Sequence, residues 1–370
     1  MLKELKKPIK LSFIGGGINS SIGKIHSMAS QLDANFSLES GFFSRDSKSN
    51  IYSKKNYNIK DNRIYNNLDS LLKNEIDKVD FFVVLVPTPN HFQVLKKLIL
   101  NNVNIIIEKP ILSNINEIKK IKKYLKNYKK KIYVVYNYVG YPAIREIQKL
   151  IEKNKFGKLL NFNLRMVQES FLRIQKKDQK VKSWRRYDHQ IPNLFLDLGI
   201  HLFNISFFLI KKKPISILAD VQKIKSLVTD AKILVTYRSN TKGTFWISKS
   251  SLGRRNDLSI ELFYEKCSIK WSQDDFESIF LNYPNGIIKK IDRSVNSKIF
   301  NQKRYNRYRM GHPAGFIEAF ANMYEDIAKE FLKKNTDYVF DHNHAFKGIN
   351  FFQICTKSSK NKKWIKNIKL

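Results

Sequence analysis

The chain has 370 residues, of which 42% are hydrophobic and 13% aromatic, a composition typical of a globular protein long enough for two domains. Its formal net charge is +36, but 54 of its 68 basic residues are lysines, which are spread along the whole sequence. We therefore expect no nucleic-acid partner, because a nucleic-acid interface gathers arginines and aromatic side chains on one face, whereas attraction of an acidic substrate is compatible with the charge.

The chain has few features of a secreted, metal-binding or membrane protein. Its two cysteines, Cys267 and Cys355, provide neither a disulfide framework nor zinc-ligand spacing, which fits a reducing compartment. His342 and His344 have no further ligands at metal-binding spacing, so we expect no metal. We see no signal peptide, and the most apolar segment, 194–210, is short and contains polar residues, so we expect a cytoplasmic protein without a membrane span.

The first 138 residues alternate apolar strands with segments of helical period. We predict strands at 9–14, 36–43, 79–86, 103–108 and 131–138. Nearly continuous apolar strands separated by helices are typical of a parallel sheet that is covered on both faces. The sequence therefore predicts a doubly wound α/β domain over residues 1–138.

A glycine-rich turn follows the first predicted strand. It contains Gly15, Gly16 and Gly17, with Ser20 where a third glycine is usual. Such glycines allow a tight turn and a close approach of the backbone to a pyrophosphate at the start of the next helix. A turn that merely joins a strand to a helix is the alternative, but the position after the first strand favours a dinucleotide-binding (Rossmann) domain.

The end of the second predicted strand is where the adenosine ribose of a dinucleotide would lie. An acidic residue there favours NAD, whereas an arginine accommodates the 2′-phosphate of NADP. The sequence has Ser44 and Arg45, followed by Asp46. Arg45 favours NADP, while Asp46 keeps NAD open.

The fourth predicted strand runs directly into Glu108, Lys109 and Pro110. A charged pair at the end of an apolar strand costs solvation free energy unless it faces water, a partner or a ligand. A surface loop is one explanation. The other is a ligand site, because the carboxyl ends of parallel strands bind ligands in such sheets.

After Tyr138 the pattern changes to that of an α+β domain. A helical stretch leads into strand-like segments at 157–168, 215–224, 231–239, 242–250, 257–264 and 268–271. Strands joined by short turns predict a large, mostly antiparallel sheet. A further helix is predicted at 312–331, with Pro313 close to its start. We assign residues 139–370 to this second domain.

The apolar helix predicted at 194–210 carries one polar stripe. Asp197, His201 and Asn204 stand at positions i, i+4 and i+7, which share one face of an α-helix. A single core histidine capped by a carboxylate is one explanation. Three polar groups on one face of so apolar a helix favour instead a helix that lines a cavity.

Four motifs follow one another in a specific order: the glycine turn, VPTPNHFQV (86–94), IIIEKPI (105–111) and LDLGIHLFN (196–204). This order resembles the Gfo/Idh/MocA family of nicotinamide-dependent sugar and polyol oxidoreductases, and the likeness extends over nearly the whole chain. The pair EKP and D-x-G-x-H is more specific than any glycine turn. The resemblance implies an enzyme that acts on a secondary hydroxyl of a sugar, polyol or sugar derivative with NAD or NADP.

The resemblance also implies roles for individual residues. The implied catalytic residues are Lys109, Asp197 and His201. Together with the glycine turn and the end of the second strand, the expected cofactor contacts are Gly15, Gly16, Gly17, Ser20, Ser44, Arg45, Thr88, Pro89, Asn90, Glu108 and Lys109. The substrate contacts are expected among Tyr138, Gln168, Trp184, Arg185, Asn204 and His312. The segments 187–195 and 264–267 depart from the usual family pattern, so the substrate of a relative does not transfer to this chain.

The resemblance leaves several alternatives open. Either His201 or Lys109 can be the base that removes the hydroxyl proton, with Asp197 orienting the histidine or a substrate hydroxyl. The same residues suit an NAD-dependent glycoside-cleaving enzyme, and a non-catalytic nucleotide- or sugar-binding regulator is a third possibility. Sheets of such second domains commonly pair between subunits, so a homodimer or homotetramer is expected.

Overall fold

The computed structural model describes residues 2–174, 187–238, 240–312 and 314–370. The chain forms two compact units: residues 1–140 with 314–346, and residues 141–313 with 347–370. These units differ from the single division at residue 138 that the sequence suggested. The segment 314–346 belongs to the first unit because the apolar face of its helix is part of that unit's core.

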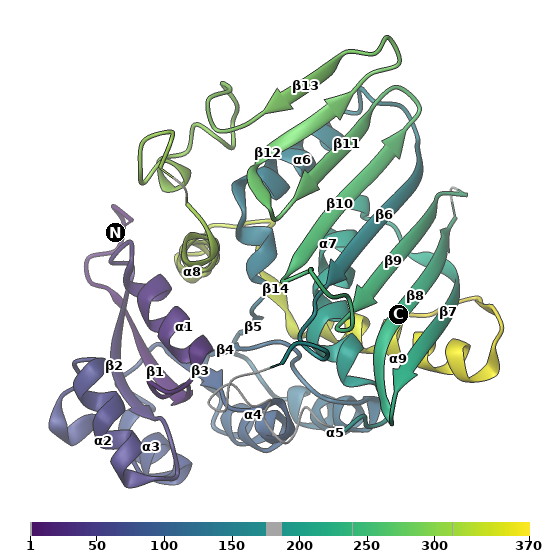
Figure 1. The fold of residues 1–370 in the computed structure, drawn as a ribbon. Helices are drawn as coiled ribbons and strands as arrows, with labels where there is room; N and C mark the ends of the chain where they lie inside the picture. The colour runs from purple at the N-terminus through teal and green to yellow at the C-terminus, as the bar shows by residue number, and fades with distance from the viewer. Residues whose placement is uncertain (1, 175–186, 239, 313) are drawn as a thin grey trace. The chain divides into compact units, whose positions relative to one another are not determined.

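The first unit is built on a six-stranded sheet in the order β14–β5–β4–β3–β1–β2 (Figure 1). Its strands are β1 (Ile9–Gly15), β2 (Phe36–Phe42), β3 (Phe81–Leu85), β4 (Ile105–Ile107), β5 (Ile132–Val134) and β14 (Phe340–Asp341). The first five are parallel, and β14 pairs with β5 in the antiparallel direction. Every residue of β3, β4 and β5 is buried, which is typical of a parallel sheet covered on both faces. The predicted doubly wound domain is confirmed.

Helices connect these strands and cover the sheet. They are α1 (Ser21–Gln31), α2 (Ser47–Asn56), α3 (Leu68–Glu75), α4 (His91–Leu100), α5 (Ile115–Leu125) and α8 (Phe316–Phe331). The chain moves from β1 to β2 in one direction and from β3 to β4 in the other. Right-handed crossovers therefore place α1 and α4 on opposite faces. Helix α8 packs beside α1, where Phe320 and Tyr324 join one apolar core with Phe13.

The second unit is built on a nine-stranded sheet in the order β13–β12–β11–β10–β6–β9–β8–β7–β15. Its strands are β6 (Leu159–Val167), β7 (Pro214–Ile224), β8 (Leu227–Tyr237), β9 (Lys242–Ser248), β10 (Asp257–Tyr264), β11 (Ser268–Ser272), β12 (Asp275–Asn282), β13 (Ile288–Ile291) and β15 (Ile365–Lys366). All neighbouring pairs are antiparallel except β6 and β9, which are parallel. The mostly antiparallel sheet is confirmed, and the carboxyl ends of β6 and β9 lie at one edge of it.

One face of this sheet is covered by helices α6 (Pro142–Glu152), α7 (Ile200–Ile210) and the later part of α9 (His342–Asn361) (Figure 1). Along β8, Ala231, Ile233 and Val235 are buried, while Lys232 and Leu234 between them are exposed. This alternation shows one face against the core and one face in solvent. Strands β12 and β13 were not predicted, because charged residues interrupt their apolar pattern.

Candidate active site

The glycine turn after β1 is built so tightly that side chains are excluded. Gly15 and Gly16 have φ values of +80° and +69°, and a Cβ atom on Gly16 would lie 2.5 Å from Leu85 Cδ1. A Cβ atom on Gly23 would lie 1.9 Å from the Gly16 carbonyl oxygen. Gly23 therefore allows the close approach of α1 to the turn. Ser20, at the position where a third glycine is usual, is the N-cap of α1, and its side chain accepts a hydrogen bond from Gly23 N at 3.3 Å.

Two side chains that the sequence analysis missed hold the backbone of this turn. The Tyr57 hydroxyl donates to the Gly16 carbonyl oxygen at 2.9 Å, and Ser53 Oγ accepts from Ile18 N at 3.0 Å. Burial raises the pKa of Tyr57 to about 12, so the phenol stays protonated and remains a donor. The glycine turn is therefore fixed before any dinucleotide binds, and it fits a pyrophosphate at the start of α1.

In the loop after β2, Arg45 and Asp46 lie in different surroundings. Asn50 closes the loop by accepting from Ser44 N at 2.9 Å and donating to Ser44 O at 2.7 Å, while Arg45 is exposed. Asp46 caps α2, where its carboxylate accepts hydrogen bonds from the Ser49 hydroxyl at 2.6 Å and from Ser49 N at 2.8 Å. These two bonds hold the pKa of Asp46 below its usual value. Asp46 is thus engaged within the protein, while Arg45 faces solvent.

The turn after β3 is tied to the turn after β4 by a buried histidine. Thr88–Asn90 form one 3₁₀ turn, and His91 begins α4. The His91 ring nitrogens lie 2.9 Å from Val86 O and 2.9 Å from Pro110 O, so the ring bridges the backbones of both turns. Burial lowers the pKa of His91, and a neutral ring donates to one of these carbonyl oxygens at a time. The VPTPNH and EKP segments are therefore coupled.

Glu108 and Lys109 follow β4 directly. The two Glu108 oxygens are used inside the unit: Oε1 lies 2.9 Å from His26 Nε2, and Oε2 accepts from Lys109 N at 3.1 Å. Only 9% of Glu108 is exposed, and Lys109 is half-buried. Tyr138, also buried, follows β5 in the 3₁₀ turn Asn137–Gly140.

The candidate residues of the first unit share one edge of its sheet. The glycine turn, Ser44, the turn at Thr88, Lys109 and Tyr138 follow β1, β2, β3, β4 and β5 respectively. Since these five strands are parallel, their carboxyl ends lie together, at the edge where such sheets bind ligands.

In the second unit, the helix that carries the polar stripe differs from its prediction. The sequence predicts one α-helix over 194–210, but Phe195–Gly199 form a π-helical turn, and α7 begins only at Ile200. The α-helical spacing assumed between Asp197 and His201 was therefore wrong, because a π turn adds a residue to the helix. Such turns are frequent at functional sites, where they change the direction of a side chain. His201 and Asn204 are both buried on α7.

Asp197 has a partner that the sequence analysis did not name. Its Oδ2 atom lies 2.6 Å from Lys249 Nζ, and the two side chains are 21% and 18% exposed. Lys249 directly follows β9, and its backbone donates to Thr229 O and accepts from Phe171 N, both at 2.8 Å. The lysine is thus held at the backbone, with its ammonium directed at Asp197.

The other substrate candidates of the second unit have different positions. Gln168 follows β6, donates from its backbone to Ser248 O at 2.8 Å and lies at the same sheet edge as Lys249. His312 is exposed. Trp184 and Arg185 lie outside the described residues, so their roles remain predictions.

Two kinds of feature are not found in the part of the chain that the structure describes. There, no group of three or more histidine, cysteine, aspartate or glutamate side chains is arranged to hold a metal ion. Within the same residues, no helix combines the length and apolarity that a membrane crossing needs.

Comparisons with known proteins agree with this geometry. A model described as an oxidoreductase family with an NAD-binding Rossmann fold matches residues 9–136, and the model of the GFO/IDH/MocA C-terminal domain matches residues 144–270. The chain is 24% identical to an uncharacterized oxidoreductase, YfiI, of Bacillus subtilis (strain 168), with 96% of this chain and 95% of the relative covered.

Two solved structures share the fold over both units. An oxidoreductase from Sinorhizobium meliloti matches with a TM-score of 0.84 and 23% identity, covering 98% of this chain and 100% of the other. An inositol dehydrogenase homologue from Azotobacter vinelandii, solved with NADH and myo-inositol, matches with a TM-score of 0.87 and 19% identity, covering 98% of each chain. The two family models together span more than half of the sequence. The chain therefore belongs to the GFO/IDH/MocA family and is an NAD-binding oxidoreductase.

Proposed function

We propose that the protein transfers a hydride between NAD or NADP and a secondary hydroxyl group of a sugar, a polyol or a sugar derivative. The main support is that Lys109 and the glycine turn follow two strands of one parallel sheet and share its carboxyl edge. The inositol dehydrogenase homologue bound to NADH and myo-inositol is consistent with a polyhydroxylated substrate.

The cofactor and the side chains of the protein have separate roles in this proposal. A bound nicotinamide supplies the hydride chemistry, so the protein has to orient the alcohol and accept its proton. The Asp197 carboxylate, which pairs with the Lys249 ammonium at 2.6 Å, can accept a hydrogen bond from a substrate hydroxyl. Lys109 and His201 are then the two candidates for the base, since a neutral amine or imidazole nitrogen can take the proton. We propose Lys109, Asp197 and His201 as the catalytic residues.

A nicotinamide absorbance assay with a panel of sugars, polyols, glycosides and sugar derivatives tests the proposal. Net reduction of NAD or NADP by a member of the panel supports a dehydrogenase. Cleavage of a glycoside without net reduction supports the glycoside-cleaving alternative. Cofactor binding with neither reaction supports a regulator.

The substitution Lys109→Ala tests the assignment of residues in the same assay. Turnover should fall by about 10²-fold or more, as expected for loss of an acid–base group, while cofactor affinity changes little. Lys126→Ala, at an exposed lysine just after α5, is the matched control. Unchanged turnover in the Lys109 variant would eliminate this residue as a catalytic group.

For the cofactor, we infer that NADP is accommodated at least as well as NAD. Arg45 is exposed at the end of β2, while the Asp46 carboxylate caps α2. An arginine at this point can pair with a 2′-phosphate.

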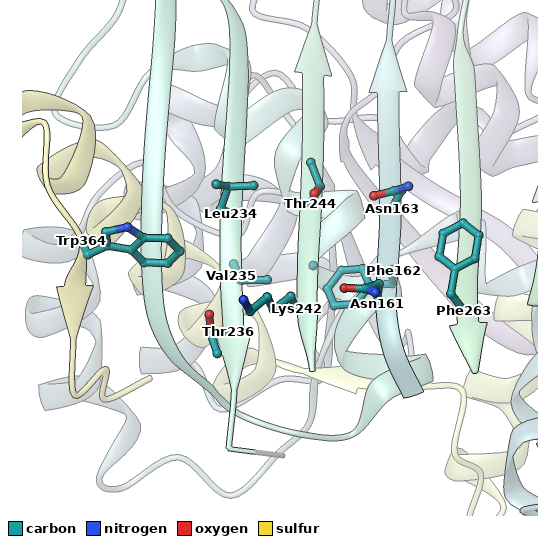
Figure 2. Close-up of a pocket in the computed structure, with 11 residues that line it drawn as sticks. Asn161, Phe162, Asn163, Leu234, Val235, Thr236, Lys242, Thr244, Phe263 and Trp364 are labelled. Atoms are coloured by element: carbon teal, nitrogen blue, oxygen red, sulfur yellow. The ribbon is translucent and has the colours of Figure 1, made fainter. Parts of the chain in front are cut away.

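We also propose that the protein self-associates as a homodimer or homotetramer through the outer face of the second unit's sheet. A hollow of about 550 Å³ lies on this face. Figure 2 shows Trp364 at one end of its lining and Phe263 at the other. Leu234 lies between them. Trp364 is 42% exposed, Phe263 is 36% exposed and Leu234 is 43% exposed. Exposed apolar side chains gathered on one face are typical of interaction surfaces.

Light scattering after size exclusion tests this interface. The wild-type mass should be a multiple of 43.6 kDa, and Leu234→Glu should lower it. Leu252→Glu, at an exposed leucine outside this hollow, is the control and should leave the mass unchanged. A monomeric wild-type protein would contradict the proposal.

We further infer a reducing, cytoplasmic setting from cysteine usage. Cys267 and Cys355 are both buried free thiols, and burial raises the pKa of each.

A further inference from the structure

Three buried side chains form a hydrogen-bonded chain that ends at Lys109. Tyr324 on α8 lies 2.6 Å from His26 Nδ1, and His26 on α1 places its Nε2 atom 2.9 Å from Glu108 Oε1. Tyr324 is 1% exposed and His26 is 0% exposed. Tyr324 and His26 are 298 positions apart in the sequence, and His26 and Glu108 are 82 positions apart. We name Tyr324, His26 and Glu108 the Glu108 relay.

One set of hydrogen-bond directions gives every polar atom of the Glu108 relay a partner. Burial and the nearby Glu108 carboxylate raise the pKa of Tyr324 well above its ordinary value, so the phenol keeps its proton. In the proposed relay the Tyr324 hydroxyl donates to Nδ1 of a neutral His26 ring, which carries its own proton on Nε2 and donates it to Glu108 Oε1. Each polar atom of the relay thereby has a partner, as buried groups require.

The other Glu108 oxygen connects the relay to Lys109, the proposed catalytic residue. Glu108 Oε2 accepts from Lys109 N at 3.1 Å, so the backbone of Lys109 is held by the same carboxylate that His26 orients. The ring of His26 is fixed in turn by edge-to-face contacts with Phe320 at 5.1 Å and Tyr324 at 5.7 Å between centroids. Both oxygens of Glu108 are thus occupied by contacts within the protein.

We propose that His26 and Tyr324 are positioning residues for Lys109, acting through Glu108. In this arrangement, the segment 314–346 supplies the outermost member of a relay that sets where the lysine stands at the carboxyl edge of the sheet. The inference rests on the function proposed above, because it gives Lys109 a position that matters for turnover. A displacement of about 1 Å at a catalytic group can cost about 10²-fold in rate.

Two substitutions of His26 separate its nitrogen atoms. In His26→Gln the side-chain amide can replace Nε2 and still donate to Glu108, whereas in His26→Asn it can replace only Nδ1. We expect His26→Asn to lower kcat by about 30- to 100-fold, with the Kd of the cofactor changed less than about twofold. His26→Gln should retain kcat within about fivefold, and Tyr324→Phe should lie between the two.

A substitution in the same core that leaves the hydrogen bonds intact is the control for destabilisation. Ile327→Ala removes a side chain from the core in which α8 packs and should lower Tm, yet kcat per folded molecule should stay at the wild-type value. The proposal is overturned if His26→Asn keeps the wild-type kcat, or if Ile327→Ala loses as much kcat as His26→Asn.

The tautomer of His26 tests the relay without any substrate. A long-range proton–nitrogen NMR spectrum, assigned with the His26→Gln variant, should show His26 protonated on Nε2 only. A ring protonated on Nδ1, or on both nitrogens, would overturn the relay even in an active enzyme. If instead the wild-type protein oxidises no member of the substrate panel and Lys109→Ala has no effect, the proposed function fails while the tautomer still reports on the relay.

Discussion

The candidate residues of the two units are held in different ways. In the first unit, Lys109 is anchored through a buried carboxylate with two engaged oxygens, and the glycine turn is clamped by Tyr57. In the second unit, Asp197 forms an ion pair with Lys249, and about a fifth of each of these side chains is exposed. Buried, fully satisfied networks are rigid, whereas a partly exposed ion pair tolerates rearrangement. We infer that the nucleotide-binding edge is fixed in advance, while the Asp197 region adapts to its substrate.

The most damaging change should be one in the fixed region. Gly23→Ala would place a Cβ atom 1.9 Å from the Gly16 carbonyl oxygen, so the glycine turn or α1 has to move. We expect cofactor affinity to fall by about 100-fold, or about 2.7 kcal/mol, in a fluorescence titration with NADH. Gly286→Asn, at a position with open space around it, should leave the affinity unchanged. An unaltered affinity in the Gly23 variant would show that this edge is not rigid.

Loss of the Lys249 ammonium should have the next largest effect. Lys249→Met leaves the partly buried Asp197 without this cation, and kcat/KM should fall by about 10- to 100-fold. Lys249→Arg, which keeps the charge, should recover most of the activity if the region adapts. Lys232→Met, at an exposed lysine on β8, serves as the control. Steady-state kinetics in which the Arg variant is as poor as the Met variant would contradict adaptability.

A smaller effect is expected when one clamp of the glycine turn is removed. Tyr57→Phe leaves the Gly16 carbonyl oxygen without its phenol donor, which should cost about 1–3 kcal/mol of unfolding free energy. Urea denaturation measures this loss, and cofactor affinity should weaken by only about threefold. Tyr52→Phe, at an exposed tyrosine on α2, the helix that Tyr57 caps, should change neither quantity. Equal results for both variants would remove Tyr57 from the fixed region.

The smallest effect concerns the choice between the two nicotinamide cofactors. Arg45→Ala should weaken NADP by about three- to tenfold, because an exposed charge pair contributes little, and should leave NAD unchanged. The ratio of kcat/KM for the two cofactors measures the change. A protein that uses NAD alone, with or without Arg45, would refute the preference.

The sequence predicted those parts of the fold that depend on local pattern. Fully apolar runs such as residues 81–85 identified the parallel sheet, and the glycine turn identified its binding edge. The π turn at Phe195–Gly199 was not predicted, because an apolar helix of this composition shows the same pattern in either form. Strand β13 was missed because two lysines interrupt its apolar pattern, as expected for a strand with no buried residue.

The residues that support the candidate catalytic side chains could not be identified from the local sequence pattern either. Lys249 is one of 54 lysines, and only its position after β9, opposite Asp197, distinguishes it. His26 and Tyr324 look like ordinary residues of amphipathic helices. Their roles follow from the packing of α1 against α8, and a periodic apolar face does not say which helix will cover it.

The discontinuity of the first unit has a consequence for biosynthesis. Residues 1–140 leave the ribosome long before α8 does. The core around Phe13 and Phe36 therefore stays incomplete until Phe320 and Tyr324 have been synthesised. The nucleotide-binding unit cannot reach its native state while the intervening 173 residues, 141–313, are still being made. Truncation before position 316 would therefore remove α8 from the core of residues 1–140 and would also remove residues 347–370 from the second unit.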